Sequence, residues 1–157
     1  MQRVVQILEA LARGEPPSPT AFSLSVHNAV GGLFTIATGD PRPVTALAAG
    51  SDTVACGVIE ACGFLLAGRP EVLLTVYDEP LPPAYAPFRE AGEAPYAWTW
   101  RMTPPGAEHF SLRRGAWRRG EEAREPAGLE ALRFFLSGAR EHTMCHGVRS
   151  WRWARHA

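Results

Sequence analysis

The sequence predicts one α/β domain over residues 1–157, in which helices pack on a mixed or parallel sheet. A length of 157 residues suits a single domain. The composition, 46% apolar and 20% charged, is that of a protein that buries a core. The third observation is a strand, helix and strand pattern over residues 44–79, which predicts a βαβ unit with a parallel crossover.

Apolar spacing and chain breakers divide the first third of the sequence. Two stretches have apolar residues at helical spacing, and each ends at a glycine, Gly14 or Gly39. Between them, a Pro-rich connector leads into residues of alternating polarity, which predicts an extended segment. A turn and a short apolar run then predict a buried strand. We therefore expect a helix over residues 2–13, a connector over 15–20 and an extended segment over 21–26. A second helix over residues 27–39, a turn over 40–43 and a strand over 44–49 should follow.

The central stretch is the most informative part of the chain. Gly50, Ser51 and Asp52 form a tight corner before an almost continuously apolar helix that Gly68 closes. After this helix we expect a buried strand over residues 71–79 and a second strand over 95–102. An Arg-dense loop over residues 111–125, a helix over 126–137 and a last strand over 148–155 should follow.

Charge and cysteine content narrow the function classes. All 16 basic residues are Arg. Residues 1–112 hold 6 Arg and 11 acidic residues, whereas residues 113–157 hold 10 Arg and 5 acidic residues, so a body of charge −5 precedes a tail of charge +5. The three cysteines predict free thiols and a cytoplasmic location. The longest apolar stretch is shorter than the roughly 20 residues that span a bilayer, and no signal peptide is expected.

Residues 18–82 resemble the N-terminal half of the β-ketoacyl synthases, within the thiolase-like fold. In these enzymes a helix with an Asn, a turn and a buried strand precede a corner that carries the nucleophilic Cys. The motifs HNAVGGLFTIATGDPRP and TALAAGSDTVACG follow this pattern without gaps and place Asn28 at the helix start and Ser51 at the nucleophile position. The chain also resembles short synthase-like proteins called chain-length-factor-like, found in type II fatty acid, polyketide and aryl polyene systems. The resemblance is weaker over residues 83–157.

The chain departs from the condensing enzymes in three ways. Ser51 replaces the Cys, the half that supplies the catalytic histidines is absent, and the elements that precede Gln2 in the family are missing. We therefore expect a fold that is incomplete at its N-terminus. The resemblance implies a non-catalytic subunit that partners a ketosynthase or forms a homodimer. Its helix over residues 52–67 would line or support the tunnel that sets chain length.

Ser51 and its neighbours allow two interpretations. A helix N-terminus can activate a thiol, but a hydroxyl starts several pKa units higher and needs a general base. The preferred interpretation is that Ser51 or Asp52 caps the helix. The alternative is a Ser51-dependent acyl transferase or hydrolase that acts on thioesters of an acyl carrier protein. His27, the nearest histidine, is not expected to be catalytic.

Other reactive side chains have simpler explanations. Cys56 and Cys62 lie in the apolar helix, where packing is the expected role. His142, Cys145 and His146 include zinc-ligand types, but their spacing matches no common closed site, so a polar connector is expected and no metal is assigned.

The densest basic cluster lies in the predicted loop and indicates an anionic partner or a solvated surface. By the family resemblance, the partner is an acyl carrier protein or its phosphopantetheine arm, which would be a substrate carrier rather than a cofactor. Single-stranded nucleic acid is a third possibility, with Trp151, Arg152, Trp153 and Arg155 adding stacking and charge, although a pI near 7.0 argues against it. The cluster consists of Arg113, Arg114, Arg118 and Arg119 around Trp117.

Overall fold

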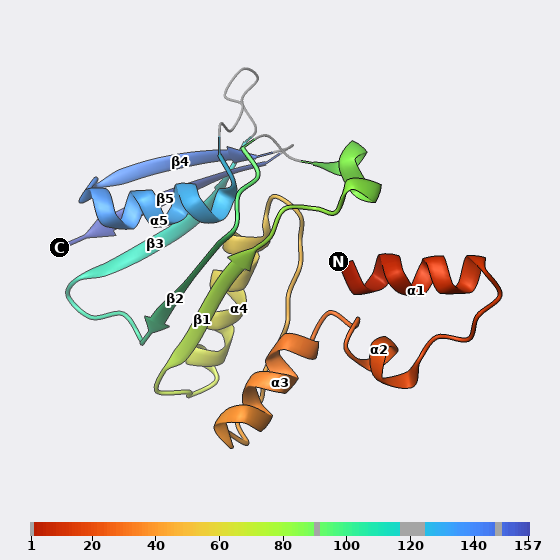
Figure 1. The fold of residues 1–157 in the computed structure, drawn as a ribbon. Coiled ribbons are helices and arrows are strands. Elements are labelled where there is room, and N and C mark those ends of the chain that lie inside the picture. The colour runs from red at the N-terminus through yellow and green to blue at the C-terminus, as the bar shows by residue number, and fades with distance from the viewer. Residues whose placement is uncertain (1, 90–91, 117–124, 147–148) are drawn as a thin grey trace. The chain divides into compact units, whose positions relative to one another are not determined.

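The computed structural model describes residues 2–89, 92–116, 125–146 and 149–157 (Figure 1). The chain divides into two compact units. The N-terminal unit consists of Met1–Leu47 and Leu81–Phe88, and the C-terminal unit consists of Ala48–Pro80 and Arg89–Ala157. Each unit is described below by itself.

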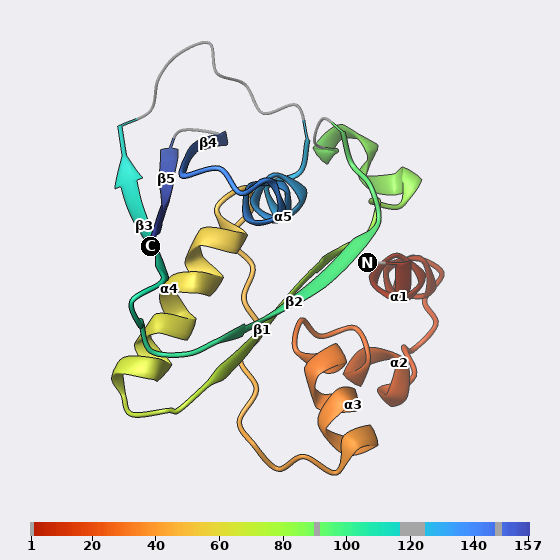
Figure 2. The same ribbon diagram turned by 90° about the vertical axis from the view of Figure 1, so that its left-hand side faces the viewer.

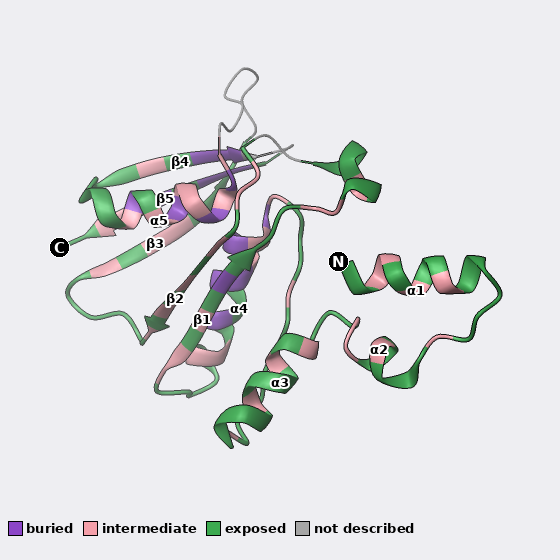
Figure 3. Ribbon diagram, in the orientation of Figure 1, coloured by how far each residue is buried: buried purple, intermediate pink, exposed green. Residues whose placement is uncertain are grey.

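Helices make up the regular structure of the N-terminal unit. They are α1 (Gln2–Ala12), α2 (Pro19–Ser23), α3 (Ala29–Thr38) and the 3-10 helix η1 (Pro83–Phe88). The two long helices confirm the predictions from apolar spacing. None of the described residues in these four helices is buried, as the green and pink ribbon of Figure 3 shows.

The prediction of an extended segment over residues 21–26 is wrong, because the first three of these residues belong to α2. The Ser18 side chain accepts a hydrogen bond from the backbone N–H of Ala21, and Pro19 occupies the first turn. A serine cap followed by a proline is a helix-start signal. This local signal outweighs the polar alternation on which the prediction depended.

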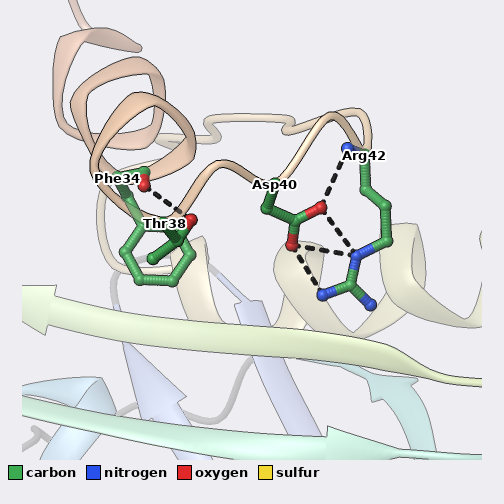
Figure 4. A network of polar contacts seen from close by, with 4 residues as sticks. All are labelled: Phe34, Thr38, Asp40 and Arg42. Atoms are coloured by element: carbon green, nitrogen blue, oxygen red, sulfur yellow. Dashed lines mark hydrogen bonds and ion pairs between the residues drawn. The ribbon is translucent and has the colours of Figure 1, made fainter.

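The turn after α3 is closed by its own side chains (Figure 4). The Thr38 hydroxyl donates to the carbonyl oxygen of Phe34 at 2.8 Å. Two residues later, the Asp40 carboxylate accepts from the backbone N–H of Arg42 at 3.0 Å and from its guanidinium at 2.6–2.9 Å. The predicted turn over residues 40–43 is thus held by a two-residue ion pair.

The prediction of a buried strand over residues 44–49 is also wrong. This segment belongs to no strand, and all of its residues except Leu47 are exposed. A strand requires a hydrogen-bonding neighbour, and within the described structure the only β-pairing of these residues is an isolated bridge between Ala49 and Ser51. Apolar composition alone therefore misled the prediction.

Over its described residues, the C-terminal unit contains two helices and five strands. Four elements match predictions within a few residues: the apolar helix, the two strands that follow it and the helix near residue 130. A further strand, β3, takes up residues 111–115 of the predicted Arg-dense loop, of which residues 117–124 lie outside the described residues. Another strand, β4, replaces the polar connector, and the last strand lies where it was expected. In chain order the elements are α4 (Thr53–Leu66), β1 (Val72–Asp78), β2 (Tyr96–Met102), β3 (His109–Gly115), α5 (Ala127–Ser137), β4 (Glu141–His146) and β5 (Arg149–His156).

The strands pair antiparallel, which corrects the predicted parallel crossover. Strands β1 and β2 form one ribbon, in which Thr75 pairs with Thr99. The other three strands form a second sheet in the order β3-β5-β4. The βαβ interpretation failed because residues 44–49 supply no strand, so β1 pairs with the strand that follows it.

The core of the C-terminal unit lies where the helices meet the strands. Helix α4 contacts β1, and α5 contacts both β4 and α4 (Figures 1 and 2). Aromatic rings fill the junction, with Trp100 centred 4.0 Å from Phe135. The buried hydrophobic cluster consists of Val54, Ala55, Val58, Val76, Ala131, Phe134, Met144, Trp151 and Trp153.

Strand β2 approaches the first turn of α5 very closely at Gly128. The Trp98 indole donates to the Gly128 carbonyl oxygen at 3.0 Å. A Cβ atom at Gly128 would overlap the ring of Tyr96, so this contact excludes larger side chains. Glycine is therefore required here by space.

In the described part of the chain, no helix combines the length and the apolarity needed to cross a membrane.

Candidate functional site

The corner that precedes α4 is a tight turn closed by the side chain of Thr53. Gly50 has a φ of +57°, a left-handed conformation that favours glycine. The Thr53 hydroxyl accepts from the backbone N–H of Ala49 at 2.9 Å and donates to the Gly50 carbonyl oxygen at 2.6 Å. These bonds fix Ser51, which is half-buried at the corner.

Asp52 does not cap α4 through its side chain, which corrects one of the two capping predictions. Its buried carboxylate instead accepts from the Trp151 indole at 2.7 Å and from the Arg149 guanidinium at 2.6 Å. Hydrogen bonds with a charged partner are roughly twice as strong as neutral ones. The carboxylate therefore fastens the start of α4 to β5.

Ser51 is hydrogen-bonded to no base in the described part of the chain. Its hydroxyl makes no hydrogen bond to a described residue, and so neither the capping role nor a Ser-His pair is formed there. His27 and Asn28 belong to the N-terminal unit. Asn28 occupies the cap position of α3, but its side chain makes no capping hydrogen bond.

The arginines of the predicted basic loop are divided between a strand and an undescribed segment. Arg113 and Arg114 are exposed on β3, whereas Arg118, Arg119 and Trp117 lie outside the described residues. Arg113 pairs in register with Arg152 of β5. Neither Arg113 nor Arg114 forms an ion pair with a described residue.

The tryptophans proposed to stack on nucleic acid are not available for stacking. Trp151 and Trp153 are 8% and 2% exposed and belong to the core. Arg155 lies over the Phe110 ring at 4.6 Å and donates to the Phe135 carbonyl oxygen. The nucleic-acid interpretation therefore loses its aromatic contacts.

The structure describes the side chains of two of the three candidate metal ligands. His142 lies 2.7 Å from a carboxylate oxygen of Glu130, Cys145 is buried, and the side chain of His146 is not described. Over residues 2–89, 92–116, 125–146 and 149–157, no group of three His, Cys, Asp or Glu side chains could hold a metal ion.

The cysteines are free thiols, as predicted. Cys56 is half-buried in α4, but Cys62 is exposed, so the expected packing role is wrong for Cys62. It faces away from the core on the same side of α4 as Ile59 and Leu66, which are also exposed.

Sequence reasoning missed Arg149 as a partner of Asp52. The two residues are 97 positions apart, and no local pattern joins them. One signal was present in the last strand, because Trp151 and Trp153 alternate with polar residues and so share one face. That alternation indicates a buried face but not the carboxylate that meets it.

Comparisons with known proteins agree with this fold. The family described as "Beta-ketoacyl synthase, N-terminal domain" matches residues 1–154. A solved structure, the ketosynthase ApeO in complex with its chain length factor ApeC from Xenorhabdus doucetiae, contains a chain with a TM-score of 0.87 and 27% identity. The alignment covers 98% of this chain but 64% of the solved chain. No curated protein matches in sequence.

These matches confirm the resemblance predicted from residues 18–82 and extend it over nearly the whole sequence. The predicted fold class is confirmed as well, with antiparallel pairing in place of the parallel crossover. The chain belongs to the β-ketoacyl synthase family and carries its N-terminal domain, a thiolase-like fold.

Proposed function

We propose that this chain is a non-catalytic β-ketoacyl synthase-like subunit, similar to a chain length factor. It would pair with a condensing ketosynthase in type II fatty acid, polyketide or aryl polyene biosynthesis. One observation carries the proposal: the corner before α4 holds Ser51 without a described base, and the neighbouring Asp52 is engaged by Trp151 and Arg149. A serine hydroxyl that lacks a base is a weak nucleophile.

The N-terminal unit supports the pairing with a second protein. Its described helices hold no buried residue, yet α3 and its approach expose large apolar side chains. Exposed apolar patches of this kind mark interaction surfaces. Ile36 is the most exposed of the group, at 79%. The other members are Phe22, Val26, Val30, Leu33 and Phe34.

The similarity to a solved ketosynthase complex supports the kind of partner. That structure contains a ketosynthase and its chain length factor. By analogy, a ketosynthase would cover the apolar surface of α3 in this protein. Acyl chains would arrive on the phosphopantetheine arm of an acyl carrier protein, and the subunit would need no cofactor of its own.

Helix α4 suits a role in the wall of an acyl tunnel. Val54, Ala55 and Val58 bury one of its faces in the core. The opposite face exposes an apolar stripe of Ile59, Cys62 and Leu66. In the proposed complex, this stripe would face the acyl chain or the ketosynthase.

The alternative enzyme, a Ser51-dependent acyl transferase or hydrolase, is not favoured. It requires a base within hydrogen-bond reach of the Ser51 hydroxyl, and no described residue provides one. A Ser51→Ala substitution separates the two functions, because it would abolish such an activity and leave a scaffold role intact.

The test is co-expression of the chain with a condensing ketosynthase from the same organism, followed by size-exclusion chromatography with light scattering. We expect a stable heterodimer for the unmodified chain and for Ser51→Ala. Ile36→Glu should weaken the heterodimer at least about tenfold, because it places a charge in the apolar interface. Leu136→Glu on α5 is the matched control, since Leu136 is 77% exposed but lies in the C-terminal unit.

Two results would contradict the proposal. One is a chain that stays apart from the ketosynthase at micromolar concentration. The other is condensing activity of the purified chain alone on acyl and malonyl carrier substrates.

A further inference from the structure

Two histidines lie directly opposite each other at one end of the β3-β5-β4 sheet. Strand register pairs His109, the first residue of β3, with His156, the last residue of β5. Their imidazole rings are stacked, with centroids 4.7 Å apart and planes inclined by 15°. His156 is exposed and His109 is half-buried. The two rings therefore form an accessible pair of nitrogen donors that the proposed function does not use.

One ring nitrogen of His109 is held by the backbone. Its Nδ1 lies 3.1 Å from the carbonyl oxygen of Gly106 and 3.3 Å from that of Ala107. A carbonyl oxygen only accepts hydrogen bonds, so in the neutral ring Nδ1 carries the proton and Nε2 carries the lone pair. Within the described structure, no hydrogen bond occupies Nε2. His109 thus presents a nitrogen that is able to bind a metal ion.

A serine hydroxyl holds His156 in a comparable way. Its Nε2 lies 2.8 Å from Oγ of Ser111, the diagonal neighbour on β3. When the Nε2–H group donates to this hydroxyl, Nδ1 carries the lone pair, and no described residue forms a hydrogen bond with Nδ1. Histidines that bind metal ions almost always donate their other N–H to a nearby acceptor, which fixes the tautomer and the ring orientation. Both histidines have such an acceptor.

The spacing of the two rings suits a shared metal ion. A zinc–nitrogen bond is about 2.0–2.1 Å long, so two imidazole nitrogens on one zinc ion lie at most about 4.2 Å apart. The ring centroids are 4.7 Å apart, and a small tilt of the exposed His156 ring brings its nitrogen within this limit. The backbone maintains the opposition, because β3 and β5 run side by side and pair over seven positions (Figure 1).

The contact between Ser111 and His156 does not make Ser111 a catalytic serine. A Ser-His pair is activated when a third group orients the base. That group would hold Nδ1 of His156, which has no hydrogen bond to a described residue. Metal binding, in contrast, requires that this nitrogen be unoccupied.

We propose that His109 and His156 form a two-histidine site for a divalent transition-metal ion such as Zn²⁺. Imidazole nitrogen is a suitable ligand for zinc, copper and nickel. Water would complete the coordination, because among the described residues no third His, Cys, Asp or Glu side chain joins the pair. The bound ion would link the first residue of β3 to the last residue of β5 and so stabilise the pairing of these strands.

The experiment titrates the full chain with ZnCl₂ by isothermal titration calorimetry, in a Cys62→Ser background that removes an exposed thiol. We expect one Zn²⁺ per chain. His109→Gln and His156→Gln should each weaken binding at least about tenfold, because the remaining imidazole loses the high effective concentration of its neighbour. His27→Gln is the matched control: His27 is also exposed but belongs to the N-terminal unit, so its replacement should leave the affinity unchanged.

A second measurement needs no histidine variant. In NMR spectra of ¹⁵N-labelled chain, Zn²⁺ should shift the resonances of Nε2 of His109 and Nδ1 of His156 and leave the ring nitrogens of His27 and His142 unchanged. Zinc affinity that is the same with and without either histidine of the pair overturns the site. A zinc-dependent shift that is confined to one ring, or that falls on the other histidines, overturns it as well. Neither result bears on pairing with a ketosynthase.

Discussion

The indole Nε1 of Trp151 donates a hydrogen bond of 2.7 Å to Asp52, which lies 99 positions earlier in the sequence. The bond joins the last strand to the first residue before α4 and is buried. Arg149 reaches the same carboxylate from the same strand. The corner before α4 is thus joined to β5 through a single carboxylate.

This joint predicts a large effect of Asp52→Ala on stability. The substitution leaves the buried Trp151 indole without an acceptor, which should lower the free energy of unfolding by about 1–3 kcal/mol. The Arg149 side chain is 45% exposed, so Arg149→Gln should lower it by less than about 1 kcal/mol. Urea unfolding monitored by tryptophan fluorescence measures both. Equal effects of the two variants would contradict the importance of the indole bond.

The packing of α5 predicts different effects for two apolar residues of the same helix. Phe134 is 3% exposed and contacts the aromatic core, so Phe134→Ala should lower the free energy of unfolding by about 3–5 kcal/mol. Leu136 projects into solvent, and Leu136→Ala should change it by less than about 0.5 kcal/mol. Thermal unfolding would show the contrast, and similar losses would mean that the outer side of α5 is packed as well.

The close approach at Gly128 predicts a destabilising Gly128→Ala. The new methyl group would overlap the Tyr96 ring, and overpacking of this kind lowers stability by about 1–3 kcal/mol. Gly32 in α3 has open space where a Cβ atom would lie. Gly32→Ala should therefore stabilise its helix by about 0.5–1 kcal/mol. Opposite signs in urea unfolding are the expected result, and two stabilising substitutions would contradict the overlap.

The ion pair after α3 predicts an unusual acid titration. The hydrogen bonds from the side chain and backbone of Arg42 lower the pKa of Asp40 to about 2. A lowered pKa stabilises the folded state at pH values above the ordinary carboxyl pKa of about 3.9. This stabilisation is lost as the pH falls through the folded-state pKa of about 2. Arg42→Gln should return the pKa toward its ordinary value. Carboxyl chemical shifts in an NMR titration report it.

The control for this titration is Arg13→Gln, which removes an exposed arginine paired with Glu15 elsewhere in the N-terminal unit. It should leave the Asp40 titration unchanged. An Asp40 carboxyl that titrates at its ordinary pKa in the unmodified chain would show that the pair is not held in solution.

Local signals explain which parts of the fold could be predicted from the sequence. Helix α4 was predictable because its apolar run is bounded by Gly50 and Gly68, which both have positive φ. The segment over residues 44–49 was not, because strand formation depends on a neighbour that sequence composition does not reveal. Strand β4 was missed because neither of its faces is uniformly apolar: buried Met144 shares a face with His142, and buried Cys145 shares the other with Glu141.

The candidate site shows the same division between local and distant effects. The corner and Ser51 were found because they are contiguous in sequence. The contact of Asp52 with β5 was not, since it depends on how the chain returns after α5. Arg113 was recognised by its charge, but its position opposite Arg152 is set by strand register.

The contact between Gly128 and Tyr96 also constrains how the sequence can diverge. The space between β2 and α5 is shared by two positions 32 apart, so neither can change size freely. In related chains, any residue larger than glycine at the first position should occur with a smaller residue at the second. The pair should therefore vary together during evolution, and a graft of one segment without the other should give a poorly folded chimera.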